Sequence, residues 1–90
     1  MTEEERITLY IKALRKYGID AQRMMVVEET GELLNALAKE CRGRATNREV
    51  ITELADVDIM IEQMAVNFGY ADFKEEKERK LKRLSERLEK

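Results

Sequence analysis

Carboxylate side chains gather in two short stretches of this 90-residue chain. The stretches are Glu28-Glu29-Thr30-Gly31-Glu32 and Glu53-Leu54-Ala55-Asp56. On an α-helix, residues three or four positions apart share a face, so each stretch presents a pair of carboxylates to one side. Oxygen ligands suit hard cations, which favours Mg²⁺, with Mn²⁺ as a second candidate. Because Mg²⁺ commonly keeps waters and shares positions with substrate phosphates, four such carboxylates indicate a catalytic metal site.

The carboxylates border the stripes that should form the core. Glu53 lies beside the apolar stripe that contains Val57 and Ile61, and Glu29 borders the stripe that begins at Val26. Like charges that converge at a partly dry margin repel each other unless a cation balances them. The alternative is a solvated face, because a chain with 19 acidic residues forms such pairs easily.

The composition predicts an all-α protein and excludes several kinds of site. Apolar residues make up 43% of the chain and charged residues 40%, with no proline, as is typical of helical bundles. The absence of histidine removes Ser-His and Cys-His catalysis and the usual zinc sites. The single cysteine, Cys41, allows no internal disulfide, and we expect it to be a small buried hydrophobe.

The net charge and the hydropathy of the chain argue against nucleic acid and membrane as partners. The net charge of −2 comes without a concentrated basic surface, so we expect no nucleic-acid partner. The acidic N-terminus does not resemble a signal peptide, and no stretch approaches the roughly 20 apolar residues of a membrane span. We therefore expect a cytoplasmic protein without a membrane partner.

The pattern predicts four helices in a single domain over residues 1–90. The first helix is predicted to start at Thr2 with Glu5 and to stop at Gly18, and the second to run from Asp20 to about Cys41, before a break at 42–45. The third is predicted to start at Thr46 with Glu49 and to end at Phe68 with Gly69. Asp72 with Glu75 marks the start of the fourth. Short connections predict antiparallel packing of neighbouring helices. The expected fold is a bundle of helical hairpins.

The second helix has an apolar surface wider than the roughly 100° stripe of a surface helix. Val26 and Leu33 lie on one flank and Val27 and Leu34 on the other. We therefore expect oligomerisation to complete the bundle; a compact four-helix monomer is the alternative. Gly31 costs roughly 1 kcal/mol relative to alanine in a helix interior, which suggests close approach of another backbone or a ligand.

The two acidic stretches also resemble a known signature. Glu28-Glu29-x-x-Glu32, a twenty-residue spacer and Glu53-x-x-Asp56 are similar to the E-E-x-x-E…E-x-x-D motif of MazG-like nucleotide pyrophosphohydrolases, in the all-α NTP pyrophosphatase superfamily. This resemblance covers about half of the chain. It implies a homodimer or homotetramer that hydrolyses nucleoside triphosphates to monophosphate and pyrophosphate with Mg²⁺, a reaction suited to nucleotide-pool housecleaning.

The resemblance also assigns roles to individual residues. The metal ligands fall on Glu29, Glu32, Glu53 and Asp56, while Glu28 would orient or deprotonate the attacking water. Similar proteins place a lysine and an arginine one turn apart in the next helix, and Lys80 and Arg83 match best as phosphate ligands. The alternative for these two is an exposed helix supported by Glu–Lys and Glu–Arg pairs.

Selection of the nucleoside has weaker signals. Tyr10 or Tyr17 could stack on a base, but core packing is the favoured role for both. Asn35 follows Glu32 on the same side of its helix and could reach the sugar or base. Two competing functions remain: a non-enzymatic helical module that oligomerises or binds a partner, and a metal- or phosphate-binding regulator without catalysis.

Overall fold

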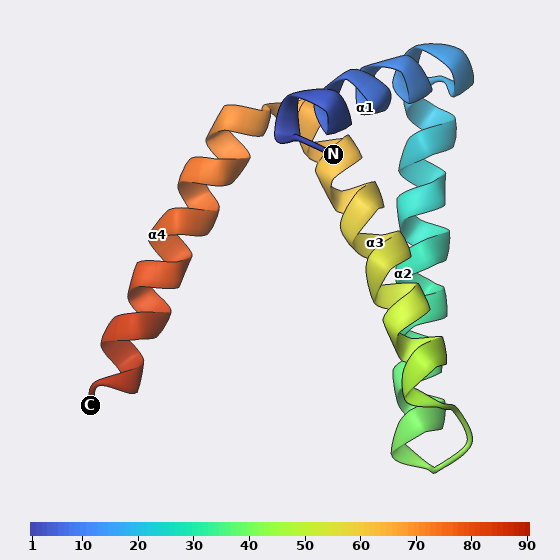
Figure 1. Ribbon diagram of the computed structural model, residues 1–90, viewed down its shortest axis with the longest axis vertical. Helices are drawn as coiled ribbons and strands as arrows, with labels where there is room; N and C mark the ends of the chain where they lie inside the picture. Colours follow the sequence, from blue (N-terminus) through green and yellow to red (C-terminus); the bar gives the residue numbers. More distant parts are fainter.

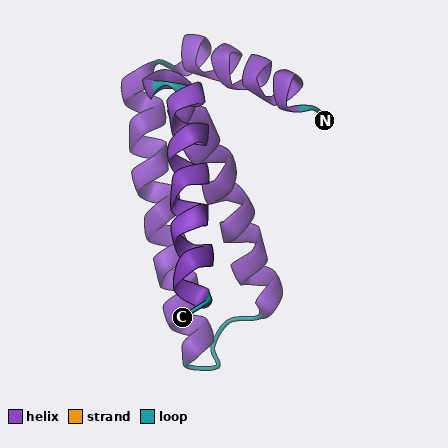
Figure 2. Ribbon diagram, turned by 90° about the vertical axis from the view of Figure 1, so that its left-hand side faces the viewer, coloured by secondary structure: helices purple, strands orange, loops and turns teal.

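The chain folds into four α-helices and no strands, which confirms the all-α prediction (Figures 1 and 2). The computed structural model describes all 90 residues. The helices are α1 (Glu3–Tyr17), α2 (Ile19–Cys41), α3 (Asn47–Phe68) and α4 (Tyr70–Leu88). None of the four is both long enough and apolar enough to traverse a bilayer.

Helices α1 and α3 begin at the predicted capping boxes. The Thr2 hydroxyl accepts a hydrogen bond from the Glu5 backbone N–H at 3.1 Å, and the Glu5 carboxylate accepts one from the Thr2 N–H at 3.3 Å. Thr46 and Glu49 repeat the arrangement at 3.2 and 2.7 Å. Each box satisfies backbone donors that a helix start leaves without partners.

Helices α2 and α4 begin earlier than predicted, so the placement of caps at Asp20 and Asp72 is wrong. Both aspartates lie within the first turn, and the caps are Gly18 and Gly69, which have φ of 91° and 133°. Each glycine ends one helix and begins the next. Its N–H donates a hydrogen bond to the preceding helix, and its C=O accepts one from the following helix. Only glycine adopts such positive φ without strain, so each corner needs no further connection.

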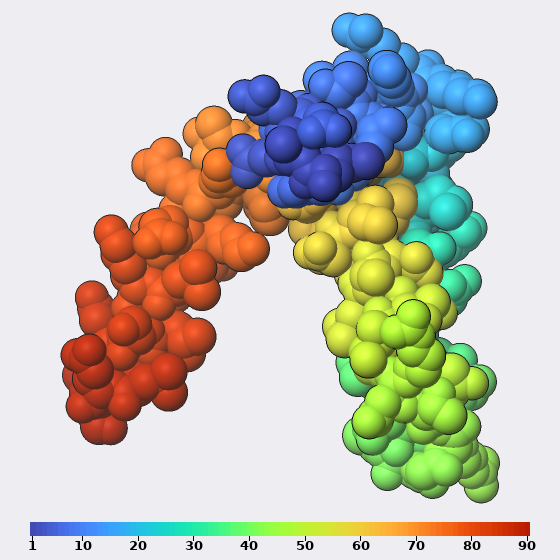
Figure 3. Space-filling view, viewed as in Figure 1, coloured from blue at the N-terminus to red at the C-terminus, as the bar shows by residue number.

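Only one pair of helices is an antiparallel hairpin along its length. Helices α2 and α3 lie side by side, joined at one end by the loop seen in Figure 2. Helix α1 crosses the other end of this hairpin, and α4 diverges from α3, so the chain has the shape of an inverted V (Figures 1 and 3). The prediction that all neighbours pack antiparallel is therefore wrong for α1 and α4.

A polar cluster fixes α1 and the start of α4 to α3. The Glu62 carboxylate accepts hydrogen bonds from the Tyr10 hydroxyl at 2.5 Å, from Arg6 Nε at 3.1 Å and from the Tyr70 hydroxyl at 3.4 Å. The bond from Tyr10 is the main reason that the pKa of Glu62 is lowered. These three hydrogen bonds to one carboxylate hold α1 and the start of α4 against α3. They therefore determine the directions of the two outer helices at the glycine corners.

The core of a single chain is small. Only five of the 90 residues are buried, and the apolar ones are Tyr10, Val57 and Ala65. The radius of gyration is 15.6 Å, whereas a compact domain of this length would have about 12 Å. The open shape follows from the divergence of α4, which leaves much apolar surface without a neighbour.

The prediction of a buried Cys41 is wrong, because this residue is exposed in the last turn of α2. No other part of the same chain approaches Gly31, since a Cβ added there meets nothing within 4 Å, and the approach of a ligand or of a second copy stays a prediction. The wide apolar surface of α2 remains uncovered in one chain: Val27, Leu34 and Leu37 are 59%, 63% and 40% exposed.

Candidate metal centre

Three of the predicted ligands converge between α2 and α3. One carboxylate oxygen each from Glu29, Glu53 and Asp56 lies within 4.8 Å of the other two. Glu29 comes from α2, and the other two lie one turn apart on α3. The antiparallel hairpin thus brings together carboxylates that are far apart along the chain.

No salt bridge balances the negative charges of these three carboxylates. Burial, followed by repulsion from neighbouring carboxylates, raises the pKa of both Glu29 and Glu53 above the ordinary value. One oxygen of each, Oε2, is buried without any hydrogen-bond donor. None of the four salt bridges in the chain involves these groups. Buried acceptors without donors are rare and costly, and a bound cation would offset that cost.

Glu32 stands next to this group. Its charge contributes to the raised pKa of Glu29 and of Glu53, so its carboxylate lies close to both. Glu32 is exposed and lines a hollow together with Glu53. The residues fit a hard divalent cation, because they offer only oxygen ligands and leave positions open for water or phosphate.

The hollow adjoins the carboxylates and continues toward the loop between α2 and α3. Its volume is about 280 Å³. It is lined by Glu32, Asn35, Ala36, Lys39, Arg44, Ala45, Glu49 and Glu53. Asn35 therefore lies in the same hollow as two of the predicted ligands, as expected from its place on the helix.

Other predicted site residues lie elsewhere. Glu28 is exposed and belongs neither to the group of three nor to the lining of the hollow. Tyr10 is only 6% exposed and its hydroxyl bonds to Glu62, which agrees with core packing and removes its ring from any base. Tyr17 is 58% exposed at the end of α1, so the expectation that it packs in the core is wrong; Lys16 Nζ lies 5.4 Å from its ring centroid.

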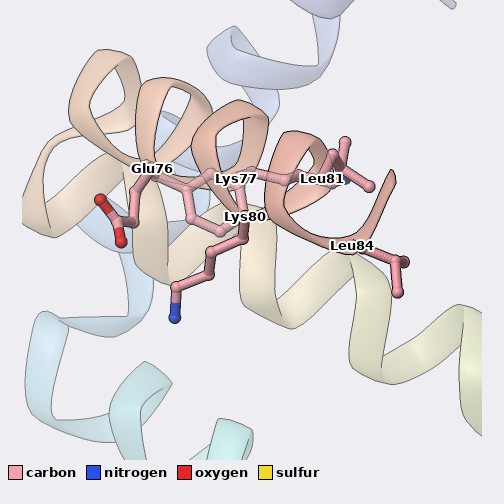
Figure 4. A pocket seen from close by; sticks show the side chains of 6 residues that line it. Glu76, Lys77, Lys80, Leu81 and Leu84 are labelled. Atoms are coloured by element: carbon pink, nitrogen blue, oxygen red, sulfur yellow. The ribbon is translucent and has the colours of Figure 1, made fainter. Parts of the chain in front are cut away.

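The basic residues of α4 are not brought to the carboxylates within one chain. Lys80 and Arg83 line a separate hollow of about 240 Å³ together with Leu84 and Arg87. Another hollow on α4, of about 430 Å³, is shown in Figure 4; it also involves Lys80, and all of its lining residues belong to α4. Because α4 diverges from the hairpin, a role for these residues at the carboxylates requires a second copy of the chain.

Two residues beside the carboxylates escaped prediction. Lys39 lies seven positions after Glu32, so a count of helix turns places it on the same side of α2. Arg44 had no comparable signal, because its position depends on the path of the loop. No family model, no curated protein and no solved structure matches this chain, so the resemblance to MazG-like enzymes rests on the motif alone.

Proposed function

We propose that this protein is a Mg²⁺-dependent hydrolase that converts nucleoside triphosphates to nucleoside monophosphates and pyrophosphate. The observation that carries the proposal is the convergence of Glu29, Glu53 and Asp56, two of which have a buried oxygen without a donor. A surface of solvated acids would hydrate both oxygens of each carboxylate. Such a group is well suited to hold a divalent cation at the edge of an open hollow.

The residues of the chain have distinct tasks in this proposal. Glu29, Glu53 and Asp56 bind the cation, and Glu32, which lines the adjoining hollow, completes the set. When bound, Mg²⁺ or Mn²⁺ would neutralise phosphate charge and make a bound water more acidic. Glu28, exposed one position before Glu29, is assigned to orient or deprotonate the attacking water. Its freedom from the cluster leaves it available as a base.

We further propose that the active form is a homo-oligomer. Seventeen large apolar side chains are exposed in one chain, and no large side chain is fully buried. Soluble monomers rarely leave so many large apolar side chains exposed, and a second copy would cover the open faces of α2 and α4. Figure 3 shows the wide opening between α4 and the hairpin, where another copy has room to pack.

The experiment that tests the function is a hydrolysis assay. The protein is incubated with Mg²⁺ and a panel of nucleoside triphosphates, and the release of monophosphate and pyrophosphate is measured. Asp56→Asn should reduce turnover by on the order of 100-fold, since loss of even an outer-shell partner costs up to that much. Asp58→Asn is the matched control, because Asp58 is exposed on the same helix outside the group.

Other outcomes separate the competing functions. Release of orthophosphate would keep a hydrolase but reject this reaction. If Asp56→Asn is as active as the control, the proposed centre is wrong. Metal binding without turnover would favour a regulator that has lost catalysis. The absence of both metal binding and turnover would favour a helical module that oligomerises or binds a partner, which the exposed apolar surface also supports.

A further inference from the structure

Two cationic side chains line the hollow beside the carboxylates and have no ionic partner. Lys39 and Arg44 both face it, and neither takes part in any of the four salt bridges of the chain. Three carboxylates also line it: Glu32 and Glu53, which belong to the proposed metal site, and Glu49, which accepts a hydrogen bond from the Thr46 N–H at 2.7 Å. The hollow therefore holds two positive charges outside any salt bridge, at the end away from the metal ligands.

The end of α2 brings the backbones of Lys39 and Arg44 together. The Arg44 N–H donates to the Lys39 carbonyl at 2.8 Å, and the Gly43 N–H donates to the Glu40 carbonyl at 2.9 Å. Together with φ of 69° at Gly43, these bonds form a Schellman motif, which turns the chain back over the helix end. Only backbone atoms make the motif, so the side chains of Lys39 and Arg44 remain free for a ligand.

The chemistry of the hollow favours phosphate over a nucleobase. No aromatic ring is among its lining residues, so a base would find no surface on which to stack. Two cations and the amide of Asn35 instead offer several hydrogen-bond donors to an anion. The volume of about 280 Å³ lies below the usual range for whole ligand pockets and suits part of a nucleotide.

The direction of the hollow follows from its two ends. Beyond Glu29 and Asp56, toward α1, the hairpin is closed by the buried side chains of Val57, Gln22 and Gln63. The open space runs the other way, from Glu32 to Lys39, about 10 Å along the helix axis for seven residues. An extended phosphate chain anchored at the carboxylates can follow this hollow toward the loop.

We propose that Lys39 and Arg44 form the subsite for the pyrophosphate leaving group, a role that rests on the proposed function. In the reaction, a water oxygen bonds to the α-phosphorus while the bond from that phosphorus to the bridging oxygen breaks. The electron pair and its negative charge leave with pyrophosphate, and the water gives up its protons to the base and solvent. Lys39 and Arg44 hold the β- and γ-phosphates before cleavage and stabilise the charge that develops on them.

The test measures binding of inorganic pyrophosphate with Mg²⁺ by calorimetry. Lys39→Gln and Arg44→Gln should each weaken binding by about tenfold, as expected for loss of a hydrogen bond to a charged group. Arg44→Lys should restore much of the affinity, since the charge is kept. Arg48→Gln is the control, because Arg48 is exposed near the same loop but does not line the hollow.

The outcomes distinguish the subsite from the function on which it rests. If the wild type hydrolyses triphosphates and both glutamine variants bind pyrophosphate as tightly as the control, the subsite is wrong and the function stands. If the wild type shows no hydrolysis but pyrophosphate binding depends on Lys39 and Arg44, the anion subsite stands and the function fails. If the wild type does not bind pyrophosphate at millimolar concentration, the subsite is also wrong.

Discussion

Binding of Mg²⁺ should raise the melting temperature of the protein through Glu29 and its neighbours. At a Mg²⁺ concentration ten times the dissociation constant, a ligand specific to the folded state stabilises it by about 1.4 kcal/mol. For a domain of this size, 1 kcal/mol shifts the melting temperature by about 4–8 °C, so the expected rise is about 6–11 °C. Thermal unfolding followed by circular dichroism at increasing Mg²⁺ measures it.

The variant Glu29→Gln should separate the stabilisation by the metal from the repulsion between the carboxylates. It removes one ligand, so most of the Mg²⁺-dependent rise should disappear. It also removes a carboxylate whose raised pKa reports burial and repulsion, so the metal-free protein should melt at a higher temperature than the wild type. Glu40→Gln, an exposed position on the same helix, should behave as the wild type. An equal Mg²⁺-dependent rise in Glu29→Gln and in the wild type would refute the proposed coordination.

Four further results are expected. Because the pKa values of Glu29 and Glu53 are raised, the folded state takes up protons before the unfolded state does; the metal-free melting temperature should therefore rise as the pH is lowered toward 4.5, and Glu29→Gln should flatten this slope. Tyr10→Phe should lower the free energy of unfolding by about 2 kcal/mol in urea titrations, because Glu62 loses its shortest hydrogen bond. Burial raises the pKa of Tyr10 to about 12, so the stability of the wild type should fall as the pH rises from 10 to 12. Tyr10→Phe should lack the part of this fall that comes from Tyr10. Leu34→Glu should shift the protein toward the monomer in analytical ultracentrifugation, since this exposed leucine lies on the uncovered face of α2; an unchanged sedimentation coefficient would place the interface elsewhere.

The helices themselves were predictable because their ends carry local signals. The capping boxes at Thr2 and Thr46 and the glycine stops act within one turn, so a single sequence contains them. The starts of α2 and α4 were misplaced for a related reason. Asp20 and Asp72 have the chemistry of N-caps, but Gly18 and Gly69 let the backbone begin a new helix at once.

The convergence of Glu29, Glu53 and Asp56 was predictable because helix periodicity and one short loop determine it. The divergence of α4 was not, since it depends on the torsion angles of Gly69 and on the hydrogen bond from Tyr70 to Glu62. The meeting of Lys39 and Arg44 was missed because it depends on the left-handed conformation of Gly43. Such features arise from tertiary geometry that a residue pattern does not contain.

All the proposed metal ligands lie within one hairpin, and this has a consequence for the order of folding. Helices α2 and α3 are neighbours in the chain, so their pairing closes only a short loop and has a low contact order. The ligands can therefore meet before α1 and α4 have docked, and a cation that binds at that stage would accelerate folding rather than only slow unfolding. The protein would then acquire its reactive centre early, with the outer helices added around a hairpin that the metal has already joined.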